Sequence, residues 1–304
     1  MVHQESHLRS AYRSCRRMQW RHDPTYYWAT RWLPRDVRSA VHALYGFVRG
    51  ADQLVDGPRR AATPEARRCA LDDWQRELER GLARGSSEHP LIAALVDAGH
   101  RHDLPLSELS IYMDSMRIDC GPVRLETRAD LDRYMRGSAG AVGLIMAPLL
   151  GVPLELHETV ARLGLAFQLT NFIRDVREDY ALDRVYLPGE ERERFGVREQ
   201  DIAQARVTPG FQSLLAGEVA RARELFAATV ELPGALSPKM RPGIHLARNV
   251  YLGVLDRVEA LGFDVLGRRV SLLPSQMGSI AVATLAQAAG GHPRYRLRAS
   301  GNRA

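Results

Sequence analysis

Two stripes of polar residues recur at helical spacing in this sequence. Both stripes combine a pair of carboxylates four residues apart with other polar side chains, and they comprise Tyr45, Arg49, Asp52 and Asp56, and then Gln168, Asn171, Asp175 and Asp179. Separations of three or four residues place the members of each stripe on one face of a helix. A single pair of carboxylates with this spacing usually lies on a solvated face of a helix. Two such helices facing each other would form an acidic cleft suited to hard divalent cations that carry a phosphate ligand.

The composition is that of a soluble globular protein and argues against nucleic-acid binding. The chain has 304 residues, of which 45% are hydrophobic and 26% are charged, so it can bury a sizeable core. Its formal charge is +6, and every basic residue except Lys239 is an arginine. The arginines are scattered among acidic residues and form no basic stripe interleaved with aromatic residues. We therefore expect no nucleic-acid partner.

The cysteine pattern and the apolar runs indicate the cellular compartment of the protein. Cys15, Cys69 and Cys120 are odd in number and widely spaced, which fits neither a disulfide framework nor a zinc site. Residues 1–10 lack the apolar core of a signal peptide, and the longest apolar run, Leu144–Val152, is interrupted by proline and glycine. The sequence thus predicts a cytoplasmic protein without a membrane-spanning helix.

The elements that must position the two stripes are helices. Strand signals are nearly absent, and most segments show a period of 3.6 residues between Pro and Gly punctuation, so we predict an all-α, single-domain helical bundle. The expected helices cover about 6–22, 25–32, 35–56, 64–83, 89–101, 107–119, 128–143, 155–180, 199–205, 209–230 and 238–262. We assign residues 1–292 to one domain and expect the Arg-rich tail, 293–304, to be disordered.

A run of small residues, Gly137–Gly143, has two readings. Glycine in a helix costs about 1 kcal/mol relative to alanine, so the run needs a reason. Either it forms a flat cavity wall, or it allows two helices to pack closely.

Taken together, several stretches resemble the squalene/phytoene synthase family of head-to-head prenyl-diphosphate condensing enzymes, closest in pattern to the bacterial phytoene synthases. The matching stretches are TYYWATRWLP (25–34), HALYGFVRGADQLVD (42–56), YMRGSAGAVG (134–143), AFQLTNFIRDVREDY (166–180), DRVYLP (183–188) and ARNVYLGVLDRVEALGFDVLGRR (247–269). They occur in the family's order over most of the chain. The resemblance implies an isoprenoid-synthase fold with a deep central cavity, two prenyl diphosphate substrates and Mg²⁺ ions, for which Mn²⁺ could substitute.

The chemistry assigns roles to the stripes. Ionisation of an allylic diphosphate requires its negative charge to be neutralised by metal ions and guanidinium groups, and the carbocation then needs a dry cavity. The expected metal ligands are Asp52, Asp56, Asn171, Asp175 and Asp179, and the four aspartates are also counted as catalytic. Arg49 and Arg174 would bind diphosphate oxygens. The resemblance adds Gln168, Tyr45, Tyr251 and the catalytic Tyr134 as cavity residues and Arg268, or its neighbour Arg269, as a diphosphate contact.

Three departures from the family pattern concern the second substrate site. Gln53 stands where a second adjacent aspartate is usual, Asp23-Pro24 replaces a small residue and a lysine, and Arg136 replaces an aromatic residue or histidine. The ionisation machinery is otherwise retained.

The main hypothesis is condensation of two geranylgeranyl diphosphates to phytoene through a cyclopropylcarbinyl diphosphate, with no need for NADPH. One alternative uses farnesyl diphosphate and stops at presqualene diphosphate or a squalene-type product. Another is a one-substrate terpene synthase or cyclase, and a third, outside this class, is an inactive lipid-binding scaffold. The apolar products are compatible with peripheral membrane contact, although no amphipathic anchor is evident. The chain length of the substrate and the oligomeric state are not readable from the sequence.

Overall fold

The structure is a computed structural model that describes residues 2–22, 27, 30–31 and 33–288. Most of the helix expected at 25–32, the departure at Pro24 and the tail at 293–304 therefore lie outside the described residues.

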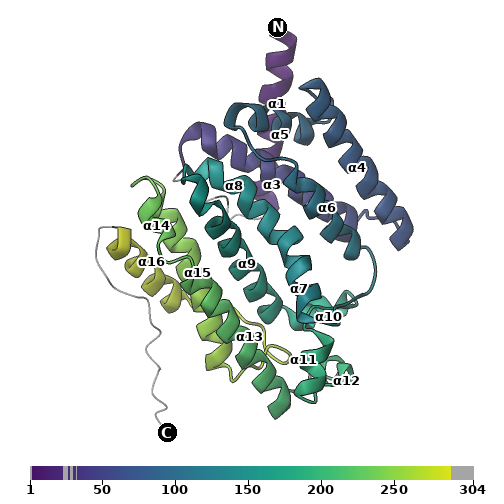
Figure 1. The fold of residues 1–304 in the computed structure, drawn as a ribbon, viewed down its shortest axis with the longest axis vertical. Helices are drawn as coiled ribbons and strands as arrows, with labels where there is room; N and C mark the ends of the chain where they lie inside the picture. Colours follow the sequence, from purple (N-terminus) through teal and green to yellow (C-terminus); the bar gives the residue numbers. More distant parts are fainter. Residues whose placement is uncertain (1, 23–26, 28–29, 32, 289–304) are drawn as a thin grey trace. The chain divides into compact units, whose positions relative to one another are not determined.

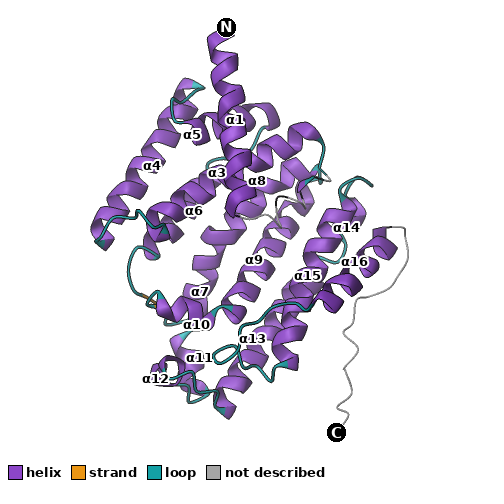
Figure 2. Cartoon of the chain, turned by 180° about the vertical axis from the view of Figure 1, so that it is seen from behind, coloured by secondary structure: helices purple, strands orange, loops and turns teal. Residues whose placement is uncertain are grey.

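The all-α prediction is confirmed. Helices make up almost all of the regular structure of the described residues, as Figure 2 shows. The exception is one pair of two-residue parallel strands, β1 (Val123–Arg124) and β2 (Arg184–Val185). β2 belongs to the segment 183–188, which leads away from the second polar stripe.

The contacts divide the chain into two compact units. Unit 1 comprises Met1–Gly121 and Arg136–Ala161, and unit 2 comprises Pro122–Met135 and Arg162–Ala304. The assignment of residues 1–292 to a single domain stays a prediction.

Unit 1 carries the first polar stripe, on α3. Its elements are α1 (Val2–His22), α3 (Arg35–Asp56), α4 (Pro64–Arg84), α5 (Pro90–His102), α6 (Glu108–Ile118), the π-helix η1 (Arg136–Gly140), α8 (Ala141–Leu150) and the 3₁₀-helix η2 (Leu154–Leu156). Helix α3 packs against α1, α4, α5, α6 and α8 (Figure 1), and its inward side chains Phe47, Ala51 and Val55 are buried. This packing holds the stripe on a fixed helix in the core of the unit.

Unit 2 carries the second stripe. The last part of α9 (His157–Arg174) belongs to it, with α7 (Arg128–Met135), α10 (Val176–Ala181), α11 (Gly189–Arg194), α12 (Glu199–Ala203), α13 (Pro209–Ala227), α14 (Leu232–Ala235), α15 (Arg241–Ala260) and α16 (Pro274–Ala288). Helix α15 packs against α13, α14 and α16.

Local signals set most helix starts. The hydroxyls of Thr63 and Thr208 accept hydrogen bonds from the third residue of the helix that follows, and Thr127 and Asp130 form a reciprocal cap at the start of α7. Ser107 occupies the N-cap position of α6, as predicted, but its side chain makes no capping hydrogen bond.

Two differences from the expected helices affect the site. The helix predicted over 155–180 is interrupted at Asp175, where the backbone leaves helical geometry (φ −105°, ψ 19°) before α10 begins. Helix α16 was not expected from the sequence, because its small and apolar residues show little periodicity.

Among the described helices, none combines the length and the apolar character needed to cross a membrane.

Candidate functional site

The first stripe lies along one face of α3, in unit 1. Tyr45, Arg49, Asp52 and Asp56 are all half-buried at successive turns of this regular helix. Nη1 of Arg49 donates a hydrogen bond to Oδ2 of Asp52, one turn further along. The Nε atom of Arg49 is buried, and among the described residues it has no acceptor. The guanidinium group therefore keeps a buried donor for an anionic ligand.

His22, at the end of α1, also belongs to this site and was not predicted from the sequence. Its Nδ1 lies 3.4 Å from Nη2 of Arg49, and its Nε2 lies 3.2 Å from the side-chain amide of Gln53. Because a guanidinium group only donates, Nδ1 of His22 accepts the hydrogen bond from Arg49. Gln53, the departure from two adjacent aspartates, is thus part of a local hydrogen-bonded group. Only the contact between α1 and α3 reveals it.

A tyrosine of α6 supports the same stretch of α3. The hydroxyl of Tyr112 donates to the backbone oxygen of Val48 at 3.1 Å. Burial, with the negative charge of Asp52 as a further cause, raises the pKa of this phenol well above its usual value. Tyr112 therefore remains a neutral donor and adds no charge to the site.

The second stripe, in unit 2, is organised differently. Arg174 binds Asp175 through two parallel hydrogen bonds, Nε to Oδ1 and Nη2 to Oδ2, each 2.6 Å long. The hydrogen bond to Asp175 raises the pKa of Arg174, which therefore stays charged. The helix is interrupted at this point, yet the backbone N–H of Asp175 still donates to Asn171, and that of Asp179 to Asp175, each at 2.8 Å. Asn171, Asp175 and Asp179 thus keep their helical succession.

Asn171 provides a test of whether this stripe suits a cation. Its Oδ1 atom is buried, and no donor among the described residues reaches it. A buried acceptor without a donor is costly unless a ligand completes it. Amide and carboxylate oxygens are the donor atoms that hard divalent cations prefer. The residues present therefore fit such an ion.

Among the described residues, no three His, Cys, Asp or Glu side chains are grouped so that they could hold a metal ion. Mg²⁺ usually keeps several waters and is bound by one or two carboxylates together with substrate phosphates.

Tyr134 lies in an aromatic cluster within unit 2. Only 3% of Tyr134 is exposed. Its ring centroid lies 5.1 Å from that of Tyr186 and 5.8 Å from that of Phe172, and the Phe172 and Tyr186 rings stack at 4.0 Å. The hydroxyl of Tyr134 donates to that of Tyr186 at 3.5 Å. Tyr186, from the segment after α10, was not predicted as a site residue, although it lies in the matching stretch DRVYLP.

The remaining predicted residues of unit 2 are distributed around the second stripe. The ring of Tyr251, on α15, lies 4.3 Å from that of Phe167, which precedes the half-buried Gln168 on α9. Arg268 is 65% exposed and forms an ion pair with Asp264 at 3.4 Å. Two residues before it, the backbone oxygen of Leu266 accepts a hydrogen bond from Arg177 of α10. The segment that carries Arg268 is therefore attached to the helix that carries Asp179.

The small-residue stretch and Arg136 belong to unit 1. A Cβ on Gly137 would lie 2.0 Å from Oγ of Ser115, and one on Gly143 would lie 2.7 Å from Cα of Ala161. At these two positions the reason for glycine is close packing. Arg136 forms an ion pair with Glu108 at 2.9 Å, so the residue that departs from the family pattern has a partner on α6.

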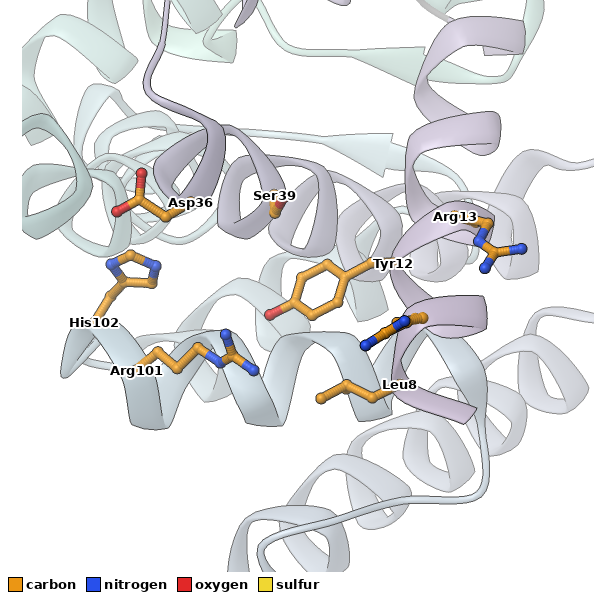
Figure 3. A pocket seen from close by; sticks show the side chains of 8 residues that line it. Leu8, Tyr12, Arg13, Asp36, Ser39, Arg101 and His102 are labelled. Atoms are coloured by element: carbon orange, nitrogen blue, oxygen red, sulfur yellow. The ribbon is translucent and has the colours of Figure 1, made fainter. Parts of the chain in front are cut away.

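A cavity of ≈ 510 Å³ in unit 1 contains none of the predicted site residues. It lies between α1, the start of α3 and the end of α5 (Figure 3). Tyr12 and Arg101 from its lining both bind Asp97 at 2.7 Å. The lining of this groove carries the charged side chains of Arg13, Asp36 and Arg101, so it does not provide the dry cavity that a carbocation requires.

Comparisons with known proteins identify the family that the chain resembles in sequence and the fold that it shares. The family model of squalene/phytoene synthases matches residues 20–276. A phytoene synthase of Thermus thermophilus is 38% identical over 251 residues, which cover 83% of this chain and 84% of the relative. A 15-cis-phytoene synthase of Synechocystis is 34% identical over 91% of this chain and 86% of the relative. A dehydrosqualene synthase solved with a ligand matches the fold with a TM-score of 0.84 at 23% identity, over 94% of this chain and 99% of that one.

Proposed function

The chain belongs to the squalene/phytoene synthase family, whose reaction is the head-to-head condensation of prenyl diphosphates, and from this premise we propose that it converts two molecules of geranylgeranyl diphosphate to phytoene. The enzyme is a prenyltransferase. The observation that carries the choice of product is its 38% identity to a phytoene synthase over 84% of that relative's length.

The arginines of the two stripes are proposed to bind and orient the diphosphate groups. Arg174 and Arg49 are already held in place by Asp175 and Asp52. A guanidinium group fixed in this way presents its donors to the leaving diphosphate without further ordering. Arg268, with Arg269 beside it, is proposed to contact a diphosphate from the segment attached to α10.

The metal is proposed to be Mg²⁺, with Mn²⁺ as a substitute; the family uses divalent metal ions to bind prenyl diphosphates. Each stripe would contribute oxygen ligands, and these are Asp52, Asp56, Asn171, Asp175 and Asp179. Bound divalent cations would neutralise the charge that develops on the departing diphosphate. The unsatisfied Oδ1 of Asn171 supports this assignment.

The aromatic residues are proposed to protect and stabilise the carbocation. The cluster of Tyr134, Phe172 and Tyr186 offers ring faces, whose negative quadrupole attracts a cation. Gln168 and Tyr251 are proposed to extend this lining within unit 2, and Tyr45 is proposed as a substrate-binding residue of unit 1. Exclusion of water by these side chains would prevent the cation from being captured as an alcohol.

The proposed chemistry has two halves. One diphosphate ionises, the 2,3-double bond of the other substrate captures the allylic cation, and loss of a proton closes a cyclopropane. The second diphosphate then leaves, the cation rearranges, and a second proton is lost to give a conjugated triene. Because the last step is proton loss and not hydride addition, we propose that NADPH is not required.

We propose a cytoplasmic location. The three cysteines are free, with Cys15 and Cys120 buried and Cys69 exposed, as expected in a reducing compartment.

The test is incubation of the pure protein with Mg²⁺ and geranyl, farnesyl or geranylgeranyl diphosphate, followed by analysis of the products. We expect phytoene from geranylgeranyl diphosphate. Preferential use of farnesyl diphosphate, a product from one substrate molecule, or binding without turnover would each exclude the proposal.

A further inference from the structure

The first helix of unit 1, α1, carries a row of exposed arginines. They follow one another at intervals of four residues and are Arg9, Arg13, Arg17 and Arg21. This spacing places them along one face of the helix, where like charges repel one another and destabilise it. The helix dipole favours only Arg21, in the last turn. The row therefore needs negative charge nearby, and the sequence of α1 contains a single acid, Glu5.

The described residues leave most of this row without a counter-charge. Among them, no ion pair involves Arg13, Arg17 or Arg21. Arg9 and Arg13 also line the cavity of ≈ 510 Å³ in unit 1, whereas Arg17 and Arg21 do not. The row thus divides into one pair at a cavity and one pair away from it. Each pair serves as a control for the other.

The cavity adds basic groups from a second helix. Arg101 and His102 contribute to its lining from the end of α5, and the lining carries one carboxylate, Asp36 of α3 (Figure 3). The basic groups of α5 complement the negative end of that helix dipole, but this reason does not apply to the arginines of α1. The lining therefore combines three guanidinium groups with one carboxylate in a concave site.

Arg101 is held in position before any ligand binds. Its Nε atom lies 2.7 Å from Oδ2 of Asp97, to which the hydroxyl of Tyr12 also donates at 2.7 Å. Burial, with the hydrogen bond to Asp97 as a further cause, raises the pKa of Tyr12, so this phenol stays neutral. The ion pair engages Nε and leaves the two terminal nitrogens of Arg101 as donors for the oxygens of a ligand. Asp97 thus orients Arg101, and the arginines of α1 supply the uncompensated positive charge.

We propose that this cavity binds a diphosphate group, either as free inorganic diphosphate or as a diphosphate ester. Planar guanidinium groups match the paired oxygens of phosphates, and the volume of the cavity is that of an ordinary small-ligand pocket. Leu8 and the ring of Tyr12 provide apolar surface for the organic part of an ester. The site contains none of the residues proposed to act on the substrates. Its binding does not depend on the proposed function, although that reaction would release inorganic diphosphate.

The test is protection of arginines from phenylglyoxal, located by peptide mass spectrometry in the wild-type chain without Mg²⁺ or prenyl substrate. Inorganic diphosphate at about ten times its dissociation constant should slow the modification of Arg13 and Arg101 roughly tenfold. Arg17 and Arg21 should react at unchanged rates. Because the readout is specific to each residue, binding at the arginines of the polar stripes is not mistaken for binding here. Equal protection of all four arginines, or protection of none, would overturn the proposal.

A matched pair of variants separates a built site from general attraction to positive charge. Arg13→Gln should raise the diphosphate concentration that half-protects Arg101 about tenfold, because it removes a charge-assisted hydrogen bond to the ligand. Arg17→Gln removes the same charge from the same row and should raise that concentration less than about twofold. Equal effects of the two substitutions would show unspecific attraction and contradict the proposal.

The choice of ligand identifies the source of the diphosphate group. Half-protection of Arg101 by geranyl diphosphate at a lower concentration than by inorganic diphosphate would assign the cavity to an ester whose apolar part lies on Leu8 and Tyr12. Half-protection at an equal or higher concentration would assign it to the free ion. Inorganic phosphate should protect at least about tenfold less well than diphosphate, since it fills only half of the site. Equal protection by phosphate would exclude a site for two phosphates.

Discussion

The two acidic stripes have the same residue spacing but different local structures. In unit 1, Asp52 and Asp56 lie on an unbroken helix, Arg49 binds Asp52 through one nitrogen, and Gln53 is directed to His22. In unit 2, the helix is interrupted at Asp175, which Arg174 holds through two nitrogens. Asn171, one turn earlier, has a buried Oδ1 atom that no donor from the described part of the chain reaches.

This difference indicates an unequal division of labour. We propose that a carboxylate fixed by a bidentate arginine, beside a buried amide oxygen, would be a preformed ligand set. A carboxylate that is held by one hydrogen bond on a half-exposed helix, as Asp52 is, can change its position more easily. We therefore expect the second stripe to dominate ionisation of the diphosphate and the first to tune metal affinity and the second substrate.

The largest effect should come from the carboxylates of the second stripe. Asp175→Asn or Asp179→Asn should reduce kcat by about 10³-fold or more, because each removes a ligand charge needed at the departing diphosphate. Because Arg174 already compensates Asp175, the substitution should change the free energy of unfolding by less than about 1 kcal/mol. Product formation and thermal melting measure the two quantities. Near-wild-type turnover in either variant would remove the metal assignment.

Substitution of one arginine in each stripe compares the two stripes directly. Arg174→Lys should lower kcat about 100-fold and Arg49→Lys only about tenfold, since lysine cannot reproduce a bidentate contact but can replace a single one. Both variants keep the charge, so far-ultraviolet circular dichroism should be unchanged and serves as the control. An equal or larger loss at Arg49 would reverse the proposed division of labour.

Gln53 should have an intermediate effect on metal use. Gln53→Asp adds a carboxylate next to Asp52 and should lower the Mg²⁺ concentration for half-maximal rate by roughly fivefold, without a large change in kcat. Gln53→Asn, which adds no charge, is the matched control. Combining Gln53→Asp with His22→Ala should increase the gain, because His22 then no longer competes with the metal ion for the new carboxylate. A redirected product would indicate a one-substrate cyclase, and no change in rate or product would show that Gln53 does not affect metal use.

The smallest effect concerns the pH dependence of folding stability. It distinguishes α3, which carries the first stripe, from the segment that carries the second stripe. His42, on α3, is buried, donates from Nδ1 to Gln19 and stacks on Tyr27. Burial, assisted by the charges of Arg38 and Arg16, lowers the pKa of His42 from 6.5 to about 4. The segment from Gln168 to Asp179 contains no histidine.

Because unfolded His42 binds a proton below pH 6.5 and the folded form does not, stability should fall as the pH decreases from 6.5 towards 4, by about 2 to 3 kcal/mol. Denaturant unfolding of wild type and His42→Gln at several pH values measures this difference. The variant should lose less stability over that interval. Parallel curves would show that His42 is not the titrating group.

Regular periodicity and punctuation made most of the fold predictable. Helix α3 was expected over 35–56 because Pro34 and Gly57 flank a strong apolar pattern, and the structure agrees. Helix α16 was missed because uncharged small residues carry no amphipathic signal. The interruption at Asp175 was missed because no proline or glycine in the local sequence breaks the helix there. The hydrogen bonds between Arg174 and Asp175 were also missed, because residue spacing does not predict side-chain contacts between neighbours in the chain.

The residue spacing also predicted the polar stripes, because separations of three or four residues are enough to place side chains on one face of a helix. His22 and Tyr186 required contacts between distant segments and could not be found in this way. Whether the predicted ligands act in catalysis is decided by the variants above. The two readings left open for Gly137 and Gly143 are resolved by their close neighbours, Ser115 and Ala161.

The central claim is that the final cation is quenched by proton loss. The most direct measurement is product formation from geranylgeranyl diphosphate under saturating Mg²⁺, with and without NADPH. We predict a conjugated triene with ultraviolet absorption, formed at the same rate in both cases. A strict requirement for NADPH, or a change from a cyclopropyl diphosphate to a reduced hydrocarbon when it is added, would contradict the phytoene assignment and favour a squalene-type product.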